Sequence, residues 1–104
     1  MSSFTSKLVR DNIPKIISDS QLDRFRFVTL SDEEYAKQLK KKLLEEVEEY
    51  LQEENMEELA DIYEVLDAIV QFKKFDPNEI LKVKQKKLNE RGGFEKRLLM
   101  EVVS

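Results

Sequence analysis

The chain has 104 residues, enough for one domain, and its 40% hydrophobic and 38% charged residues are typical of a helical globular protein. It contains no cysteine and no histidine, which excludes disulfides, thiolate or imidazole metal sites and Ser-His-Asp catalysis. The net charge of −4 is unevenly spread: residues 31–76 carry −9, whereas residues 1–30 carry +2 and residues 77–104 carry +3.

This charge distribution favours some partners over others. An acidic centre between basic ends suits a divalent cation bound together with a phosphorylated small molecule, although charge scatter on helix surfaces is the alternative. With a pI near 5.0, nucleic acid is not an expected partner. No apolar run approaches the ~20 residues that span a bilayer, and the first residues lack the apolar core of a signal peptide. We therefore expect no membrane association and a cytoplasmic location.

The first part of the chain predicts short elements. Pro14 suits a first helical turn and predicts a short helix over residues 13–19. Residues 24–30 alternate arginine with phenylalanine and predict a strand, for which residues 94–103 are the candidate partner.

Three longer helices follow, and each has a recognisable start. Ser31 opens a capping box for a helix over residues 32–53, a short break at Glu54-Asn55 precedes a helix over residues 56–73, and Asp76-Pro77 begins a helix that ends at Arg91. The short break predicts an antiparallel hairpin. Because the helix over residues 56–73 is apolar over most of its circumference, we expect a homodimer or homotetramer. The predicted fold is thus mostly α: a single domain, residues 1–104, with a helical hairpin inside an oligomeric helix bundle and one or two short peripheral β-strands.

The hairpin carries nine carboxylates between Leu43 and Asp61, and helical projection separates them. At ~100° per residue, Glu46 and Glu49 lie roughly 60° and 120° from the centre of the first apolar stripe. On the second helix Glu58 and Asp61 lie roughly 40° and 100° from the apolar centre, whereas Glu64 and Asp67 face solvent. Four hard oxygen donors on facing helices predict a site for Mg²⁺, with Mn²⁺ as the other option, formed by Glu46, Glu49, Glu58 and Asp61.

A purely structural interpretation of the same carboxylates stays open. Glu58 can close a capping box with Asn55, Glu46 can bond to Lys42 within its helix, and Asp61 can face an arginine.

Basic residues near both ends are candidates for phosphate binding. Lys84, Lys87 and Arg91 share one face of the last helix, and Lys7 and Arg10 form a basic N-terminal tip. The alternative for the helical lysines is that their stems cover apolar surface.

Three motifs in order resemble a known family. Glu45-Glu46-Val47-Glu48-Glu49 followed by Glu58-Leu59-Ala60-Asp61 resembles the EExxE…ExxD signature of MazG-like all-α nucleoside triphosphate pyrophosphohydrolases, relatives of phosphoribosyl-ATP pyrophosphohydrolase. The opening KLVRDNIP and the closing RGGFEK resemble a small single-domain branch of that family, so that the resemblance covers nearly the whole chain.

The resemblance implies a nucleotide substrate, hydrolysed to nucleoside monophosphate and pyrophosphate with Mg²⁺, and a role in removing non-canonical nucleotides. Carried over by position, Glu46, Glu49, Glu58 and Asp61 are metal ligands, while Glu45 and Glu46 are catalytic, Glu45 by orienting or activating water. A non-catalytic module of the same fold that binds a nucleotide or a protein, and a structural helical oligomer, are the alternatives.

Overall fold

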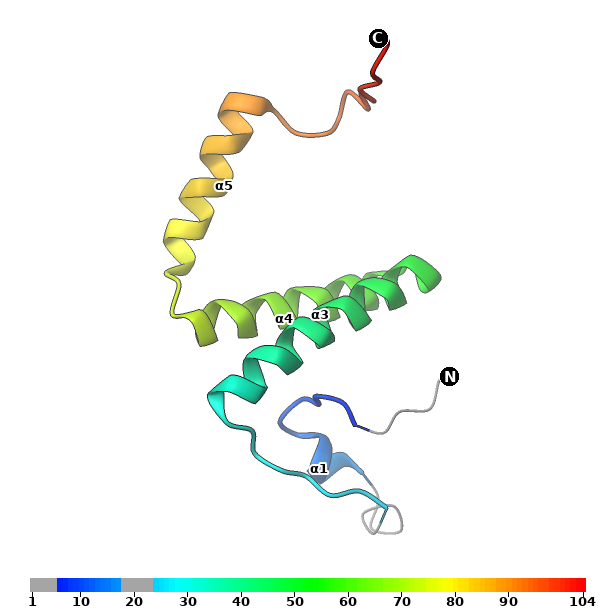
Figure 1. Cartoon of the computed structure of the whole chain (residues 1–104), viewed down its shortest axis with the longest axis vertical. Helices are drawn as coiled ribbons and strands as arrows, with labels where there is room; N and C mark the ends of the chain where they lie inside the picture. The colour runs from blue at the N-terminus through cyan, green and yellow to red at the C-terminus, as the bar shows by residue number, and fades with distance from the viewer. Residues whose placement is uncertain (1–5, 18–23) are drawn as a thin grey trace.

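The computed structural model describes residues 6–17 and 24–104, and the described part is helical with extended connections (Figure 1). Its helices are α1 (Ile13–Ile16), α3 (Asp32–Glu53), α4 (Met56–Lys73) and α5 (Pro77–Arg91). The three long helices have the bounds that the sequence predicts. The helix expected over residues 13–19 is wrong in its extent: it ends after one turn at Ile16, because Ile17 has an extended backbone with ψ of 133°, and residues 18–19 lie outside the described residues.

Each long helix begins where a side chain satisfies its first free N–H groups. The side chains of Ser31, Asn55 and Asp76 accept hydrogen bonds of 3.2, 2.9 and 2.9 Å from backbone N–H groups two or three residues further along. Pro77 occupies the first turn of α5, where its missing N–H costs nothing. Because these hydrogen bonds are local, the first residue of each long helix can be predicted from the sequence.

The turn between α3 and α4 is short and has a left-handed residue at its start. Glu54, with φ of 49°, ends α3 and donates its N–H to the carbonyl of Tyr50 at 2.7 Å. One residue later Asn55 caps α4, so the two helices run back along each other as an antiparallel hairpin (Figure 1). The predicted hairpin is confirmed.

The hairpin has a thin core of its own. Leu39 of α3 and Val65 of α4 are the buried apolar side chains among the described residues, and the Tyr35 and Phe72 rings meet edge to face at 5.2 Å near the open end. Two helices can bury only the stripe along their contact. Most of the apolar surface of α4 is therefore left outside the hairpin.

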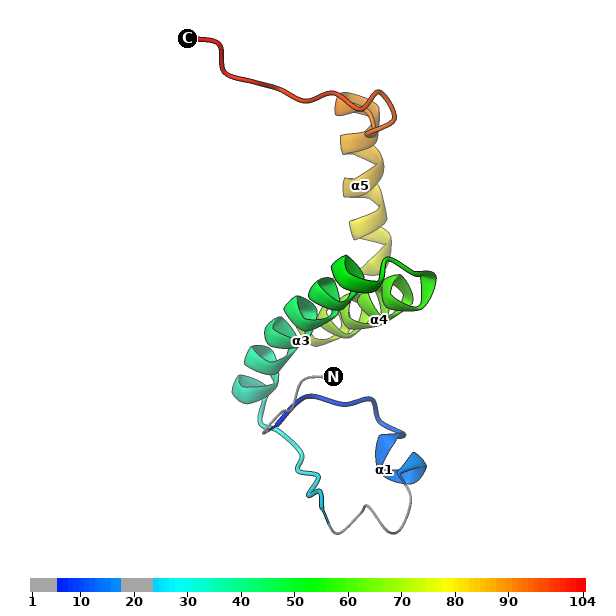
Figure 2. The same cartoon turned by 90° about the vertical axis from the view of Figure 1, so that its right-hand side faces the viewer.

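Helix α5 rises from the end of α4, and the C-terminal segment continues away from the hairpin, whereas α1 and the segment before α3 lie on its other side (Figures 1 and 2). The radius of gyration is 18.3 Å. A compact chain of this length has a radius of about 13 Å. The chain is thus more extended than a compact domain of the same length.

Neither predicted strand is formed: residues 24–30 and 94–103 are described without strand pairing. A strand needs a partner for its backbone groups, and these two segments lie on opposite sides of the hairpin (Figure 1). The prediction rested on local β-propensity, which does not bring partners together.

Within residues 6–17 and 24–104, no helix combines the length and apolar character needed to cross a membrane.

Candidate metal centre

Carboxylates from both hairpin helices meet in one cluster. Oxygen atoms of Glu46 on α3 and of Glu58 and Asp61 on α4 all lie within 4.8 Å of one another. Glu46 is 5% exposed, so it is the most deeply buried charged residue of the described chain. Three of the four predicted ligands are thus brought together across the helix contact.

The fourth predicted ligand, Glu49, lies beside this cluster, next to Glu58. Burial raises the pKa of the Glu58 carboxyl, and the charge and hydrogen bond of Glu49 and the charges of Asp61 and Glu46 raise it further. Like charges held this close favour a bound proton or a bound cation. The other three predicted carboxylates therefore all act on Glu58.

Lys42 is an internal counter-ion for the α3 side of the cluster. Its Nζ lies 3.1 Å from Glu46 Oε1 and 3.4 Å from Glu45 Oε1. Burial opposes the charge of Lys42, but the hydrogen bond to Glu46 and the negative charges of Glu45 and Glu46 outweigh it and raise the Lys42 pKa. The ammonium is consequently held in its charged form against the cluster.

Arg10 provides a second cation from far away in the sequence. Its Nη2 donates to Asp61 Oδ1 at 2.7 Å, and this ion pair fastens the N-terminal segment that also contains Lys7 to α4. Both side chains are more than a third exposed, so the pair is accessible to solvent and contributes little to stability. Arg10 can therefore leave Asp61 at low cost.

Of the three structural alternatives predicted for these carboxylates, the Glu46–Lys42 pair and an arginine facing Asp61 are present, but the Glu58 carboxylate does not close a capping box, and two oxygens are left without partners. Glu58 is hydrogen-bonded to the Asn55 cap through its backbone N–H only, Glu46 pairs with Lys42, and Asp61 pairs with an arginine. Glu46 Oε2 and Glu58 Oε2 are buried without a hydrogen-bond partner among the described residues. An unpaired buried carboxylate oxygen is costly. The cluster can therefore hold a metal ion, and a hard cation fits its all-oxygen donors.

An acidic pocket opens next to the cluster at the hairpin tip. It has a volume of about 410 Å³ and is lined by Glu45, Glu48, Glu49, Gln52, Glu53, Asn55 and Glu58. Of the two residues predicted to be catalytic, Glu45 lines this pocket and Glu46 does not; of the predicted metal ligands, Glu49 and Glu58 line it. Glu48 and Glu53 line it too, because the pocket is open to solvent.

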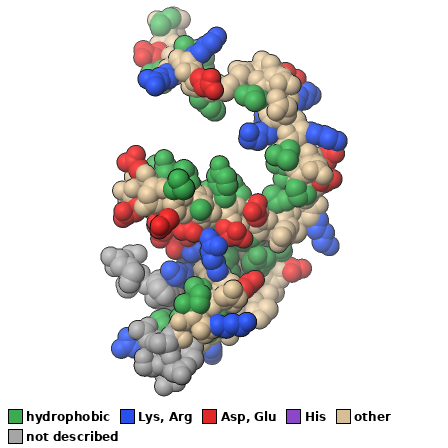
Figure 3. Space-filling model, turned by 180° about the vertical axis from the view of Figure 1, so that it is seen from behind, with side chains coloured by type: hydrophobic (Ala, Val, Ile, Leu, Met, Phe, Trp, Pro, Cys, Tyr) green, Lys and Arg blue, Asp and Glu red, His purple; other side chains and the backbone are tan. Residues whose placement is uncertain are grey.

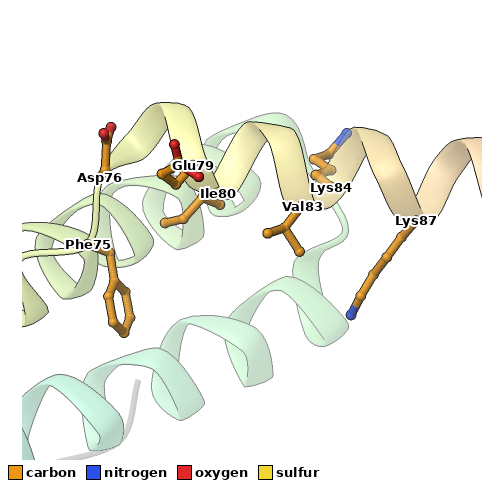
Figure 4. A pocket seen from close by; sticks show the side chains of 7 residues that line it. All are labelled: Phe75, Asp76, Glu79, Ile80, Val83, Lys84 and Lys87. Atoms are coloured by element: carbon orange, nitrogen blue, oxygen red, sulfur yellow. The ribbon is translucent and has the colours of Figure 1, made fainter.

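The lysines predicted to bind phosphate lie elsewhere in the chain. Lys84 and Lys87 line a second cavity of about 470 Å³ with the apolar side chains of Phe75, Ile80 and Val83 (Figure 4). Arg91 ends α5, which rises away from the hairpin. Within one chain, the basic face of α5 therefore does not reach the acidic pocket. Helix periodicity could not predict this, because the position of that face depends on the angle between α4 and α5.

Sequence reasoning missed the particular arginine that faces Asp61, because a contact between residues 51 positions apart leaves no local pattern. Gln52 and Asn55 were also missed as lining residues of the pocket; their place at the hairpin tip was the available signal. No protein-family model, curated protein or solved structure matches the chain.

Proposed function

We propose that the chain is a Mg²⁺-dependent nucleoside triphosphate pyrophosphohydrolase. The observation that carries the proposal is Glu46, which is 5% exposed and keeps one oxygen unpaired at the centre of a carboxylate cluster. A structural ion pair would use both oxygens or leave the second one in water. A cation that completes this arrangement, next to an open pocket, is the basis of a catalytic site.

The proposed ligands are Glu46, Glu49, Glu58 and Asp61. Oxygen donors of this kind suit Mg²⁺ or Mn²⁺ rather than a soft metal. These residues would hold such an ion, and it would supply a Lewis acid that makes the phosphorus of a bound phosphate easier to attack.

The chain supplies the proton acceptor. Since it has no histidine, a carboxylate is the available general base, and Glu45 combines partial exposure with a place in the acidic pocket. Glu45 accepts a proton from the attacking water, Glu46 helps to hold the site, and the water oxygen bonds to the α-phosphorus. The bond from that phosphorus to the bridging oxygen breaks, so that pyrophosphate leaves and nucleoside monophosphate remains. Lys42, whose Nζ lies 3.4 Å from Glu45 Oε1, helps to hold this carboxylate in place.

Arg10 and Lys7 are the proposed phosphate contacts within one chain. Arg10 already donates to a member of the cluster, and its exposed guanidinium can turn from Asp61 to a phosphate oxygen. A guanidinium binds phosphate through two parallel N–H groups, which favours this exchange when a nucleotide arrives.

The test is pyrophosphate release from a panel of standard and modified nucleoside triphosphates with Mg²⁺, together with calorimetric titration of Mg²⁺ alone. We expect release from at least one substrate, and a loss of at least a hundredfold in Glu49→Gln and Asp61→Asn. Glu64→Gln is the matched control, because Glu64 is an exposed α4 carboxylate outside the cluster. Absence of release from every substrate, or release unchanged in the two ligand variants, would refute the enzymatic proposal; nucleotide binding without turnover would favour a non-catalytic module.

A further inference from the structure

Two side-chain cations lie against the carboxylate cluster, and they are held in different ways. Lys42 stands on α3 one turn before Glu46, its side chain is 16% exposed, and its Nζ lies 3.1 Å from Glu46 Oε1. Arg10 comes from the N-terminal segment, and 57% of its side chain is exposed where it meets Asp61. The space-filling view shows basic side chains among the acidic ones on the side of the hairpin away from α5 (Figure 3). Lys42 is thus a built-in cation of the cluster, whereas Arg10 is a removable one.

The oxygens that remain without a cation or a hydrogen bond are those of a site for one ion. Oxygens of Glu46, Glu58 and Asp61 lie within 4.8 Å of one another. Glu46 Oε2 and Glu58 Oε2 are buried and have no hydrogen-bond partner among the described residues. Glu46 Oε1, by contrast, already lies against the Lys42 ammonium. Glu46 can therefore give one oxygen to an ion in the cluster and has no second oxygen free.

A second ion would require the oxygen that Lys42 occupies. In two-metal sites that cleave phosphate bonds, the ions lie about 3.5–4 Å apart. Divalent ions this close repel each other strongly, so a carboxylate between them must give one oxygen to each. Mg²⁺ lies about 2.1 Å from such an oxygen. The Lys42 ammonium, 3.1 Å from Glu46 Oε1, repels a divalent ion that approaches the same atom.

Helix geometry keeps Lys42 in this place when an ion binds. Residues three and four positions apart lie one above the other on a helix, and Lys42 uses both spacings, with Glu45 Oε1 at 3.4 Å and Glu46 Oε1 at 3.1 Å. If Lys42 moved away, Glu46, which is 5% exposed, would lose its counter-charge. An incoming ion can therefore displace Arg10 from Asp61 but leaves Lys42 where it is.

We propose that the metal centre takes one divalent ion per chain, and that the Lys42 ammonium occupies the place that a second ion takes in two-metal phosphate-cleaving sites. Lys42 is then a positioning residue, which fixes both the number of ions and the orientation of Glu45 and Glu46. The inference rests on the proposed function for the presence of the ion, whereas its test requires no substrate.

This arrangement has a consequence for the attacking water. In a two-metal site, the second ion can hold that water and lower its pKa. An ammonium donates hydrogen bonds but does not coordinate a water oxygen as a metal ion does. The proton of the water must therefore go to a carboxylate without help from a second ion. Glu45, which contacts Lys42 and lines the acidic pocket, is placed for this role.

The first measurement counts the ions bound to the full chain. Calorimetric titration of chelator-treated protein with Mg²⁺ should give one ion per chain, a count that does not depend on the oligomeric state. Lys42→Met should bind two, because it frees Oε1 of both Glu45 and Glu46. Lys42→Arg, which keeps the charge, should return the count to one. Lys37→Met, which removes an exposed lysine of the same helix, should leave it at one.

The second measurement replaces Mg²⁺ with Mn²⁺ and uses electron paramagnetic resonance. Saturated parent protein should give the spectrum of isolated Mn²⁺, and Lys42→Met should give that of a spin-coupled pair. Circular dichroism shows whether Lys42→Met is folded, and Lys42→Gln replaces it if it is not.

Two ions per chain or a coupled pair in the parent would overturn this inference and leave the proposed function standing. A folded variant without the charge at position 42 that still binds one ion would overturn the role of Lys42. No bound ion in the parent would overturn this inference together with the metal dependence of the proposed function. One bound ion without pyrophosphate release from any substrate would support this inference and refute the enzymatic proposal alone.

Discussion

Replacing Lys42 with methionine should destabilise the metal-free protein far more than replacing a lysine on the surface of the same helix. The Lys42 side chain is 16% exposed and lies 3.1 Å from Glu46, whose side chain is 7% exposed. Methionine keeps most of the apolar stem and removes the charge. The substitution therefore leaves the Glu46 carboxylate buried with neither oxygen compensated.

The expected loss is about 3 kcal/mol in the free energy of unfolding, the lower end of what removing one partner of a buried ion pair costs, because Lys42 keeps some contact with water. Lys37→Met is the matched control on α3. Its ammonium is 74% exposed and lies 3.9 Å from Glu33, so its removal should cost less than about 0.5 kcal/mol. Urea unfolding in the presence of a chelator, at one fixed protein concentration, measures both.

Mg²⁺ should then restore much of the stability lost in Lys42→Met, because a bound cation replaces the Lys42 ammonium in balancing the negative charge of Glu46. At ten times the dissociation constant, one bound ion stabilises a protein by about 1.4 kcal/mol, and a tighter site in the variant gains more. Equal losses in Lys42→Met and Lys37→Met, or Mg²⁺ stabilising parent and variant by the same amount, would refute this account of the buried pair.

Three further predictions concern the same centre. Because the folded-state pKa of Glu58 lies above its ordinary value of 4.5, the folded metal-free chain binds a proton there more tightly than the unfolded chain does. Below pH 4.5, Glu58→Gln and the parent should therefore have the same free energy of unfolding. As the pH rises through the folded-state pKa of Glu58, the variant should become the more stable protein, as paired urea titrations in chelator would show. A difference in stability that stays constant across that pH range would contradict this. Arg10→Gln should tighten Mg²⁺ binding by about threefold in calorimetry without nucleotide, because it removes the cation that competes for Asp61 across an exposed pair; weaker binding would contradict the competition. The loss of a helix cap in Asn55→Ala or in Asp76→Ala should lower the free energy of unfolding in urea by about 1 kcal/mol. Only Asn55→Ala should also weaken Mg²⁺ binding, because α4 begins at the metal centre.

The helices could be predicted from the sequence because their starts are local. Ser31, Asn55 and Asp76 each bond to a backbone group within three residues, so a short window of sequence contains the whole interaction. The strands could not be predicted in the same way. A strand is stabilised by a partner, and the two candidate segments lie on opposite sides of the hairpin.

The same difference between local and long-range contacts decides which parts of the candidate site could be predicted. Helix periodicity placed Glu46, Glu58 and Asp61 together and rejected Glu64, because angles within a helix follow from residue spacing alone. The Arg10–Asp61 pair depends on how a distant segment folds back. The position of α5 depends on the connection at Lys74–Asp76. Neither leaves a periodic signal, so the sequence could not show which of the predicted basic residues lie near the carboxylates.

Helix α4 has little of its circumference left for variation. One side packs on α3 through Val65, the neighbouring side presents Glu58 and Asp61, and the opposite side carries exposed apolar residues, Leu59, Tyr63 and Leu66. The remaining arc contains Glu57, Ala60, Glu64, Asp67 and Gln71, which are all exposed and recur at alternating spacings of three and four. Tolerance to substitution along α4 should thus rise and fall with the helical period of three to four residues, and neutral drift should accumulate at those positions while the positions that pack on α3 or carry the clustered carboxylates stay constrained.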